Sequence, residues 1–132
     1  MEPDHSGSLM RLAQEYPEMK IVGNAKTFTA VSYTHLGTGA LSEGRMLEVG
    51  EGSTISLGSH RLRFLLAPMV HWPEVMTAYE ETEKILFSAD AFGRFGSLER
   101  TARAPWTPQA RRYYYNIVGK YGAQVQALLR CV

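Results

Sequence analysis

The 132-residue chain has one cysteine, a net charge of only +1 and no long apolar segment, and each of these features excludes a class of protein. Cys131 cannot form an intrachain disulfide or a thiolate metal site, so any metal must be bound by histidines and carboxylates. The longest apolar run, at 64–70, is far shorter than the roughly 20 residues that span a bilayer, and the N-terminus lacks a secretory signal. We therefore expect a cytoplasmic protein with no membrane partner.

The remaining composition, 45% hydrophobic and 20% charged residues, is that of a globular protein with room for one domain. The segment 111–115 combines arginines with tyrosines, as some nucleic-acid platforms do. Helical spacing would distribute these side chains around the helix axis, which favours a mixture of core and surface positions. The arginines of 94–107 are expected to be solvated, although they could form a basic patch for a partner. We expect no nucleic-acid partner.

Hydrophobic spacing predicts helices and strands along the whole chain. We expect a short helix over 6–16 that ends before Pro17, a buried strand at 20–23, and either a helix or an extended segment at 25–31. Further strands are predicted at 46–49, 53–57, 61–66, 75–79 and 85–88, with the first three forming a meander.

Charged residues 80–84 between the last two predicted strands read as a solvated hairpin turn. Two helices are then predicted, at 108–119 and 123–131, with Thr107 as the cap and Pro108 at the first helical position. Strands followed by helices predict an α/β layered sandwich.

A cluster of metal-binding side chains opens the chain, where Glu2, Asp4 and His5 precede the first helix. Oxygen and imidazole donors together suit iron, manganese or zinc. An Asp-His pair before a helix has a simpler interpretation, namely a helix cap beside a surface histidine. The cluster by itself leaves both interpretations open.

Two further candidate ligands follow apolar runs. His71 ends the run that starts at Phe64, and Asp90 ends a strand-like run that starts at Ile85. A carboxylate beside buried apolar residues is costly unless it is paired or bound to a metal. The histidines at positions 35 and 60 lie in predicted loops and turns, where we expect them to be exposed and not to bind metal.

The order of these residues resembles the metal-ligand pattern of the flavodiiron proteins, also called A-type flavoproteins. In the wider metallo-β-lactamase superfamily the first motif is H-x-H-x-D-H and typically binds zinc, whereas the flavodiiron version has glutamate, here Glu2, in place of the second histidine. A carboxylate there favours iron over zinc. Four segments also resemble the family: Asp4–Ser8, Gly23–Thr27, Ala67–Pro73 and Phe87–Gly93.

The resemblance implies a metallo-β-lactamase-like αββα sandwich with a non-haem di-iron site. Glu2 and His71 would bind one iron, Asp4 and His5 would bind the other, and Asp90 would bridge the two. The parent family reduces O2 to water or NO to N2O. Its electrons come through FMN on a flavodoxin-like domain, from a rubredoxin-like or flavin donor, and the parent is expected to be a homo-oligomer.

The chain also departs from the family pattern. The family has a histidine two places before the position of Glu2 and another well beyond the position of Asp90, and the chain contains neither. It also lacks a flavodoxin phosphate loop. We therefore expect residues 1–132 to form a partial domain, incomplete at both ends, without the flavodoxin-like domain and inactive alone. The alternatives are a di-metal hydrolase of the same superfamily, in which Asp4 positions a hydroxide, or a non-catalytic remnant that binds no metal.

Overall fold

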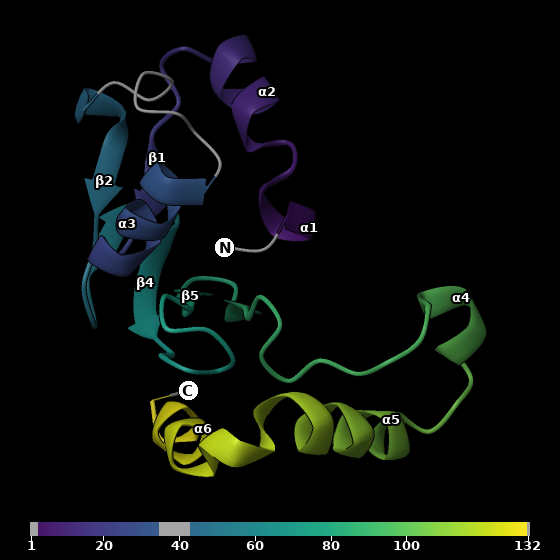
Figure 1. Ribbon diagram of the computed structural model, residues 1–132. Helices are drawn as coiled ribbons and strands as arrows, with labels where there is room; N and C mark the ends of the chain where they lie inside the picture. The colour runs from purple at the N-terminus through teal and green to yellow at the C-terminus, as the bar shows by residue number, and fades with distance from the viewer. Residues whose placement is uncertain (1–2, 35–42, 132) are drawn as a thin grey trace.

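The computed structural model describes residues 3–34 and 43–131 (Figure 1). The first part of the chain forms the short helices α1 (Pro3–Ser6) and α2 (Leu9–Glu15), strand β1 (Ile21–Gly23) and helix α3 (Ala25–Thr34). Of these two short helices, the second corresponds to the helix predicted at 6–16, whereas the first, which contains His5, was not predicted. The second ends before Pro17 as expected, because the residue that precedes a proline disfavours helical backbone angles.

The first sheet is a parallel pair of short strands, β1 and β2 (Met46–Glu48), in which Ile21 lies opposite Met46. A single-turn 3₁₀ helix, η1 (Glu43–Arg45), precedes β2. The strand at 46–49 was wrongly predicted to begin the meander. Parallel strands need a long crossover connection, and α3 lies in that connection. Of the two alternatives predicted for 25–31, the helix is correct.

The second sheet is an antiparallel meander in the order β3-β4-β5-β6. Its strands confirm the four predicted segments, with these bounds: β3 (Thr54–Ser56), β4 (Arg61–Leu66), β5 (Met76–Glu80) and β6 (Ile85–Phe87). Phe64 pairs with Ala78, and Ala78 pairs with Phe87 across the sheet. The connections that follow β4 and β6 carry two of the candidate ligands.

The turn between β5 and β6 is not fully solvated, contrary to the prediction, because Glu80 is only 6% exposed. Its carboxylate accepts hydrogen bonds from the backbone amides of Thr82 and Glu83, and it pairs with Nδ1 of His60 at 3.2 Å. Burial alone would raise the pKa of Glu80. The hydrogen bonds from Glu83, Thr82 and His60 outweigh burial and lower the pKa to about 2.

This lowered pKa gives an expected pH dependence of stability. Ionised Glu80 is favoured in the folded chain, so its contribution is complete above the ordinary glutamate pKa of 4.5 and is lost as the pH falls toward about 2. We expect Glu80→Gln to be less stable than the wild type near neutral pH and to lose less stability over that acidic range. Urea denaturation at several pH values measures the free energy of unfolding of each protein. The control is Glu83→Gln, which makes the same change at an exposed glutamate of the same turn. Parallel pH profiles for wild type and Glu80→Gln would contradict the assignment.

The C-terminal part of the chain is helical. It comprises α4 (Leu98–Thr101), α5 (Trp106–Tyr113), a π-helical turn η2 (Tyr114–Val118), a 3₁₀ turn η3 (Gly119–Tyr121) and α6 (Gly122–Leu129). The predicted start of this region was wrong, because Pro105 occupies the cap position and Thr107 lies inside the helix. Pro108 is then the third helical residue, which is tolerated because the first amides of a helix have no partner within it.

The main apolar core lies between the loops that follow β4 and β6 and the C-terminal helices. It contains Ala67, Val70, Ala91, Val118, Val125 and Leu128. In Figure 1 these loops run between α1 on one side and α5 and α6 on the other. Tyr114 packs against this core while Tyr115 is exposed, which confirms the mixed core and surface interpretation of 111–115. Among the described residues, no helix is long and apolar enough to cross a membrane.

Candidate metal centre

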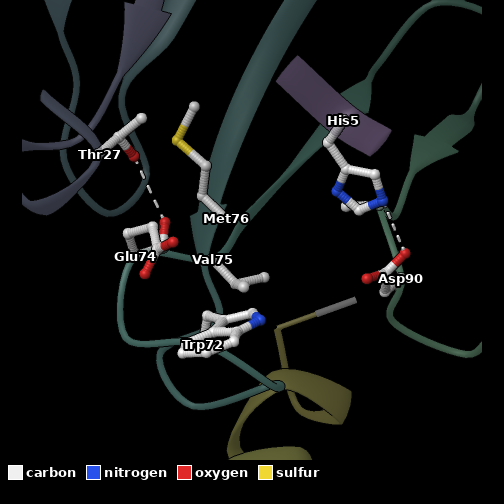
Figure 2. Close-up of a pocket in the computed structure, with 8 residues that line it drawn as sticks. His5, Thr27, Trp72, Glu74, Val75, Met76 and Asp90 are labelled. Carbon is white, nitrogen blue, oxygen red and sulfur yellow. Dashed lines mark hydrogen bonds and ion pairs between the residues drawn. The ribbon is translucent and has the colours of Figure 1, made fainter. Parts of the chain in front are cut away.

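Three of the five predicted ligands meet at one place, where the Asp90 carboxylate lies between two imidazoles. Nε2 of His5 is 3.1 Å from Oδ1 of Asp90, and Nε2 of His71 is 3.4 Å from Oδ2. Each carboxylate oxygen therefore faces a different histidine. Figure 2 shows the His5 and Asp90 part of this arrangement. All three side chains are partly accessible to solvent.

Three separate segments supply these side chains. His5 lies on α1, His71 lies in the connection between β4 and β5, and Asp90 follows β6. Backbone hydrogen bonds hold both loops: the amide of Ala67 donates to the carbonyl of Val75 at 2.9 Å, and the amide of Gly93 donates to the carbonyl of Asp90 at 3.1 Å. The antiparallel pairing of β4, β5 and β6 brings the two loops together, although the two ligands are 19 residues apart in sequence.

The backbone around these ligands adopts unusual angles. Met69, Ala89 and Phe92 have φ values of 66°, 50° and 63°, in the left-handed region that non-glycine residues rarely occupy. Each costs on the order of 1–2 kcal/mol relative to ordinary backbone. Such strain concentrates at functional sites, where the surrounding structure imposes it. Its presence on both sides of Asp90 and before His71 supports a functional role for these loops.

The other two predicted ligands cannot be placed. Glu2 lies outside the described residues, and Asp4 is described only as part of the backbone of α1. Within the described part of the chain, no group of three or more His, Cys, Asp or Glu side chains is arranged to hold one metal ion.

The distances around Asp90 nevertheless fit a carboxylate shared by two metal positions. Zinc, for example, binds nitrogen and oxygen donors at about 2.1 Å in tetrahedral geometry, so two donors on one such metal are roughly 3.4 Å apart. The separations of 3.1 and 3.4 Å from Asp90 to His5 and to His71 are close to this value. The donor set of imidazole and carboxylate also suits iron. The described residues thus fit the metals that the sequence implies.

A pocket of about 160 Å³ opens beside His5 and Asp90. Figure 2 shows these two residues on one side of it and Thr27 and Glu74 on the other. Apart from Trp72, its remaining lining residues were not singled out in the sequence: Val75, Met76 and Ala89. The ring of Trp72 lies 5.8 Å from the His71 ring. Trp72 and Ala89 lie in segments that resemble the family, whereas Val75 and Met76 lie outside them. The pairing of β4, β5 and β6 brings these side chains together.

Asn24 is another residue that sequence reasoning did not assign. It is buried, its Oδ1 accepts the amide hydrogen of Thr27 at 3.0 Å, and its Nδ2 donates to the carbonyl of Glu74 at 2.8 Å. Asn24 therefore caps α3 and ties this helix to the loop of His71. An asparagine immediately before a helical pattern is a recognised start signal and would have identified the cap.

The two histidines that were not expected to bind metal have different outcomes. Position 35 lies outside the described residues. His60 pairs with Glu80 in the meander, and it does not belong to the cluster around Asp90. Its side chain is partly exposed, as predicted.

Comparison with known proteins identifies the family. A family model described as "ODP family beta lactamase" matches residues 1–118, which is most of the chain. The chain belongs to this ODP family. The solved rubredoxin oxygen:oxidoreductase of Desulfovibrio gigas is 29% identical and superposes with a TM-score of 0.85 over 98% of this chain and 33% of that chain. The predicted α/β metallo-β-lactamase-like fold, present as part of a domain, is confirmed.

Curated relatives of this ODP-family chain are oxidoreductases by name. The anaerobic nitric oxide reductase flavorubredoxin of Vibrio vulnificus is 33% identical over 135 residues, covering 98% of this chain and 26% of that protein. The coenzyme F420H(2) oxidase of Methanocaldococcus jannaschii is 36% identical over 94 residues, covering 71% of this chain and 22% of that protein. The chain thus spans about a quarter of the length of these relatives. The resemblance to flavodiiron proteins is confirmed.

Proposed function

We propose that this chain supplies metal ligands to an oxidoreductase that reduces O2 to water or NO to N2O at a non-haem di-iron site. The observation that carries the proposal is the position of the Asp90 carboxylate between His5 and His71, with one oxygen toward each imidazole. A carboxylate in this position is placed to bridge two metals. The names of the curated relatives, a nitric oxide reductase and an oxidase, support this class of reaction.

In this proposal Glu2 and His71 bind one iron, Asp4 and His5 bind the other, and Asp90 is shared. Glu2 immediately precedes α1, so it is near His5 in sequence, and Asp4 is adjacent to His5. When bound, the irons supply electrons and coordination positions for a diatomic gas. No described residue of this chain acts as a nucleophile in the proposed reaction.

The protein's own side chains have three roles in this proposal. In the metal-free chain Asp90 contacts Nε2 of both imidazoles, which keeps the three donor side chains together for metal binding. Val75 and Met76 line the adjacent pocket with apolar surface, which disfavours water and favours an apolar gas. Glu74 lines the same pocket and is, with His5 and Asp90, one of its ionisable residues. It is therefore placed to pass protons, which the reduction of either gas consumes.

The oxidoreductase is favoured over a hydrolase of the same fold. The relatives that cover most of this chain are named as reductases and oxidases. The carboxylate of Glu2, where the zinc enzymes of the superfamily have histidine, adds negative charge that favours iron. The names of the relatives and the carboxylate of Glu2 therefore both favour an oxidoreductase over a hydrolase.

The described residues do not fit a flavin, so we derive no step through one. Segment 50–54 combines glycines with serine and threonine, but it leads into strand β3 and not into a helix, so it presents no helix N-terminus to a phosphate. We propose that FMN is held by a flavodoxin-like domain of the parent protein, which receives electrons from a rubredoxin-like or flavin donor. We also propose that the protein works in the cytoplasm.

Anaerobic loading with Fe(II) tests the proposed site. After desalting, the chain should retain about two irons, because imidazole and carboxylate donors bind this metal. His5→Ala and His71→Ala should each reduce the iron content, while His60→Ala, in the meander, should leave it unchanged. Retention of no iron, or preferential binding of zinc with esterase turnover, would overturn the proposal. Equal loss in all three variants would show that the histidines act only through folding.

A further inference from the structure

An apolar cavity of about 120 Å³ lies on the other side of the two ligand-bearing loops, against the C-terminal helices. Its buried lining consists of Val70, Ala91, Val118 and Val125. Val70 immediately precedes His71, and Ala91 immediately follows Asp90. The cavity is therefore one residue away from two candidate ligands, and it is distinct from the pocket beside His5.

The remaining wall of this cavity is largely aromatic. Trp106, at 53%, is the most exposed of the aromatic lining residues, which places it at the mouth. Tyr114 and Val118, at the two ends of the π-helical turn η2, both contribute to the lining. Single π-helical turns within α-helices occur frequently at functional sites. The irregular helix thus helps to shape the space next to the metal loops.

The chemistry of the lining indicates what the cavity can hold. Among the described residues that line it, none is charged, and the only polar side-chain atoms belong to the tryptophan and the tyrosines. A buried water needs about two to four polar partners, whereas an apolar cavity of roughly 150 Å³ stays dry and binds xenon or benzene. A cavity of this size and character favours a small apolar molecule over water.

We propose that this cavity binds a diatomic gas, O2 or NO, and stores it beside the metal centre. This inference rests on the proposed function, because it assumes that one of these gases is the substrate. Transfer of an apolar gas from water into an apolar cavity is favourable. The loops of His71 and Asp90 form one wall, so a bound gas is separated from the ligands only by these loops.

Dissolved O2 is itself the probe, because it is paramagnetic and broadens the NMR signals of nearby methyl groups. The metal-free chain with ¹³C-labelled methyl groups is placed under O2 pressure, with N2 at equal pressure as the control. We expect the methyl groups of Val70, Val118 and Val125 to broaden more than those of the exposed Leu129, although they are buried. Weaker broadening of the buried methyl groups than of Leu129 would overturn the proposal.

Cavity-filling variants complete the test. Ala91→Leu fills the buried wall but could disrupt folding, so Ala110→Leu, on the half-buried face of α5, provides a second variant. Ala110→Leu should abolish the excess broadening of Val118 and Val125, while the matched exposed variant Ala127→Leu should not. Persistence of the broadening in Ala110→Leu would contradict the inference. Because no iron is present, this result is independent of the iron-loading experiment.

Discussion

Replacing Asp90 by asparagine should weaken iron binding by more than about 100-fold. Loss of a group that only orients a metal ligand costs about 10–100-fold in affinity, and Asp90 is proposed to bind both metals directly. The substitution keeps the shape of the side chain and removes the charge between His5 and His71. Anaerobic Fe(II) titration of wild type and Asp90→Asn measures the effect.

The control for this prediction is Glu99→Gln, which makes the same chemical change at an exposed position on α4. Its iron affinity should equal that of the wild type. Far-UV circular dichroism should be unchanged in Asp90→Asn. If Asp90→Asn is folded and binds iron with wild-type affinity, the carboxylate is not a ligand and the proposed centre is wrong.

Replacing Leu128 by alanine should destabilise the chain by about 2–5 kcal/mol, the range for deleting a buried leucine side chain. Leu128 is 2% exposed and belongs to the core that contains Val70 and Ala91. Loss of this packing should therefore loosen the attachment of α6 to the ligand-bearing loops. Urea denaturation measures the free energy of unfolding, and iron titration measures the effect on the site.

The neighbouring residue offers a matched control for the core. Leu129 is 50% exposed on the same helix, and surface substitutions usually change stability by less than about 0.5 kcal/mol. Leu129→Ala should therefore be close to wild type in both measurements. Similar losses of stability in the two variants would show that α6 is not packed against the core as described.

The strands of the meander and the candidate ligands were largely accessible to sequence reasoning. Alternating or continuous apolar runs bounded by turn residues identified β3 to β6, because a strand's side chains must match the two faces of a sheet. His71 and Asp90 were recognisable because each ends an apolar run and both match a family pattern. The pairing of β2 with β1 was missed, because a run of three residues carries no information about its partner.

The buried state of Glu80 was also missed. A run of charged residues between two strands normally predicts a solvated turn, and nothing in the spacing indicates that one carboxylate folds back. Backbone amides of Thr82 and Glu83 become donors only when the turn closes. The interaction therefore depends on the turn conformation and not on the composition of the segment.

The sequence by itself determined the types of metal donor, their order and their family resemblance, because these depend on residue identity and spacing. It could assign Asp90 a shared role only by that resemblance. The tertiary structure decided that Asp90 lies between His5 and His71, because the antiparallel strands β4, β5 and β6 bring two loops together beside α1. It also decided where the apolar cavity lies, because helices distant in sequence pack against those loops.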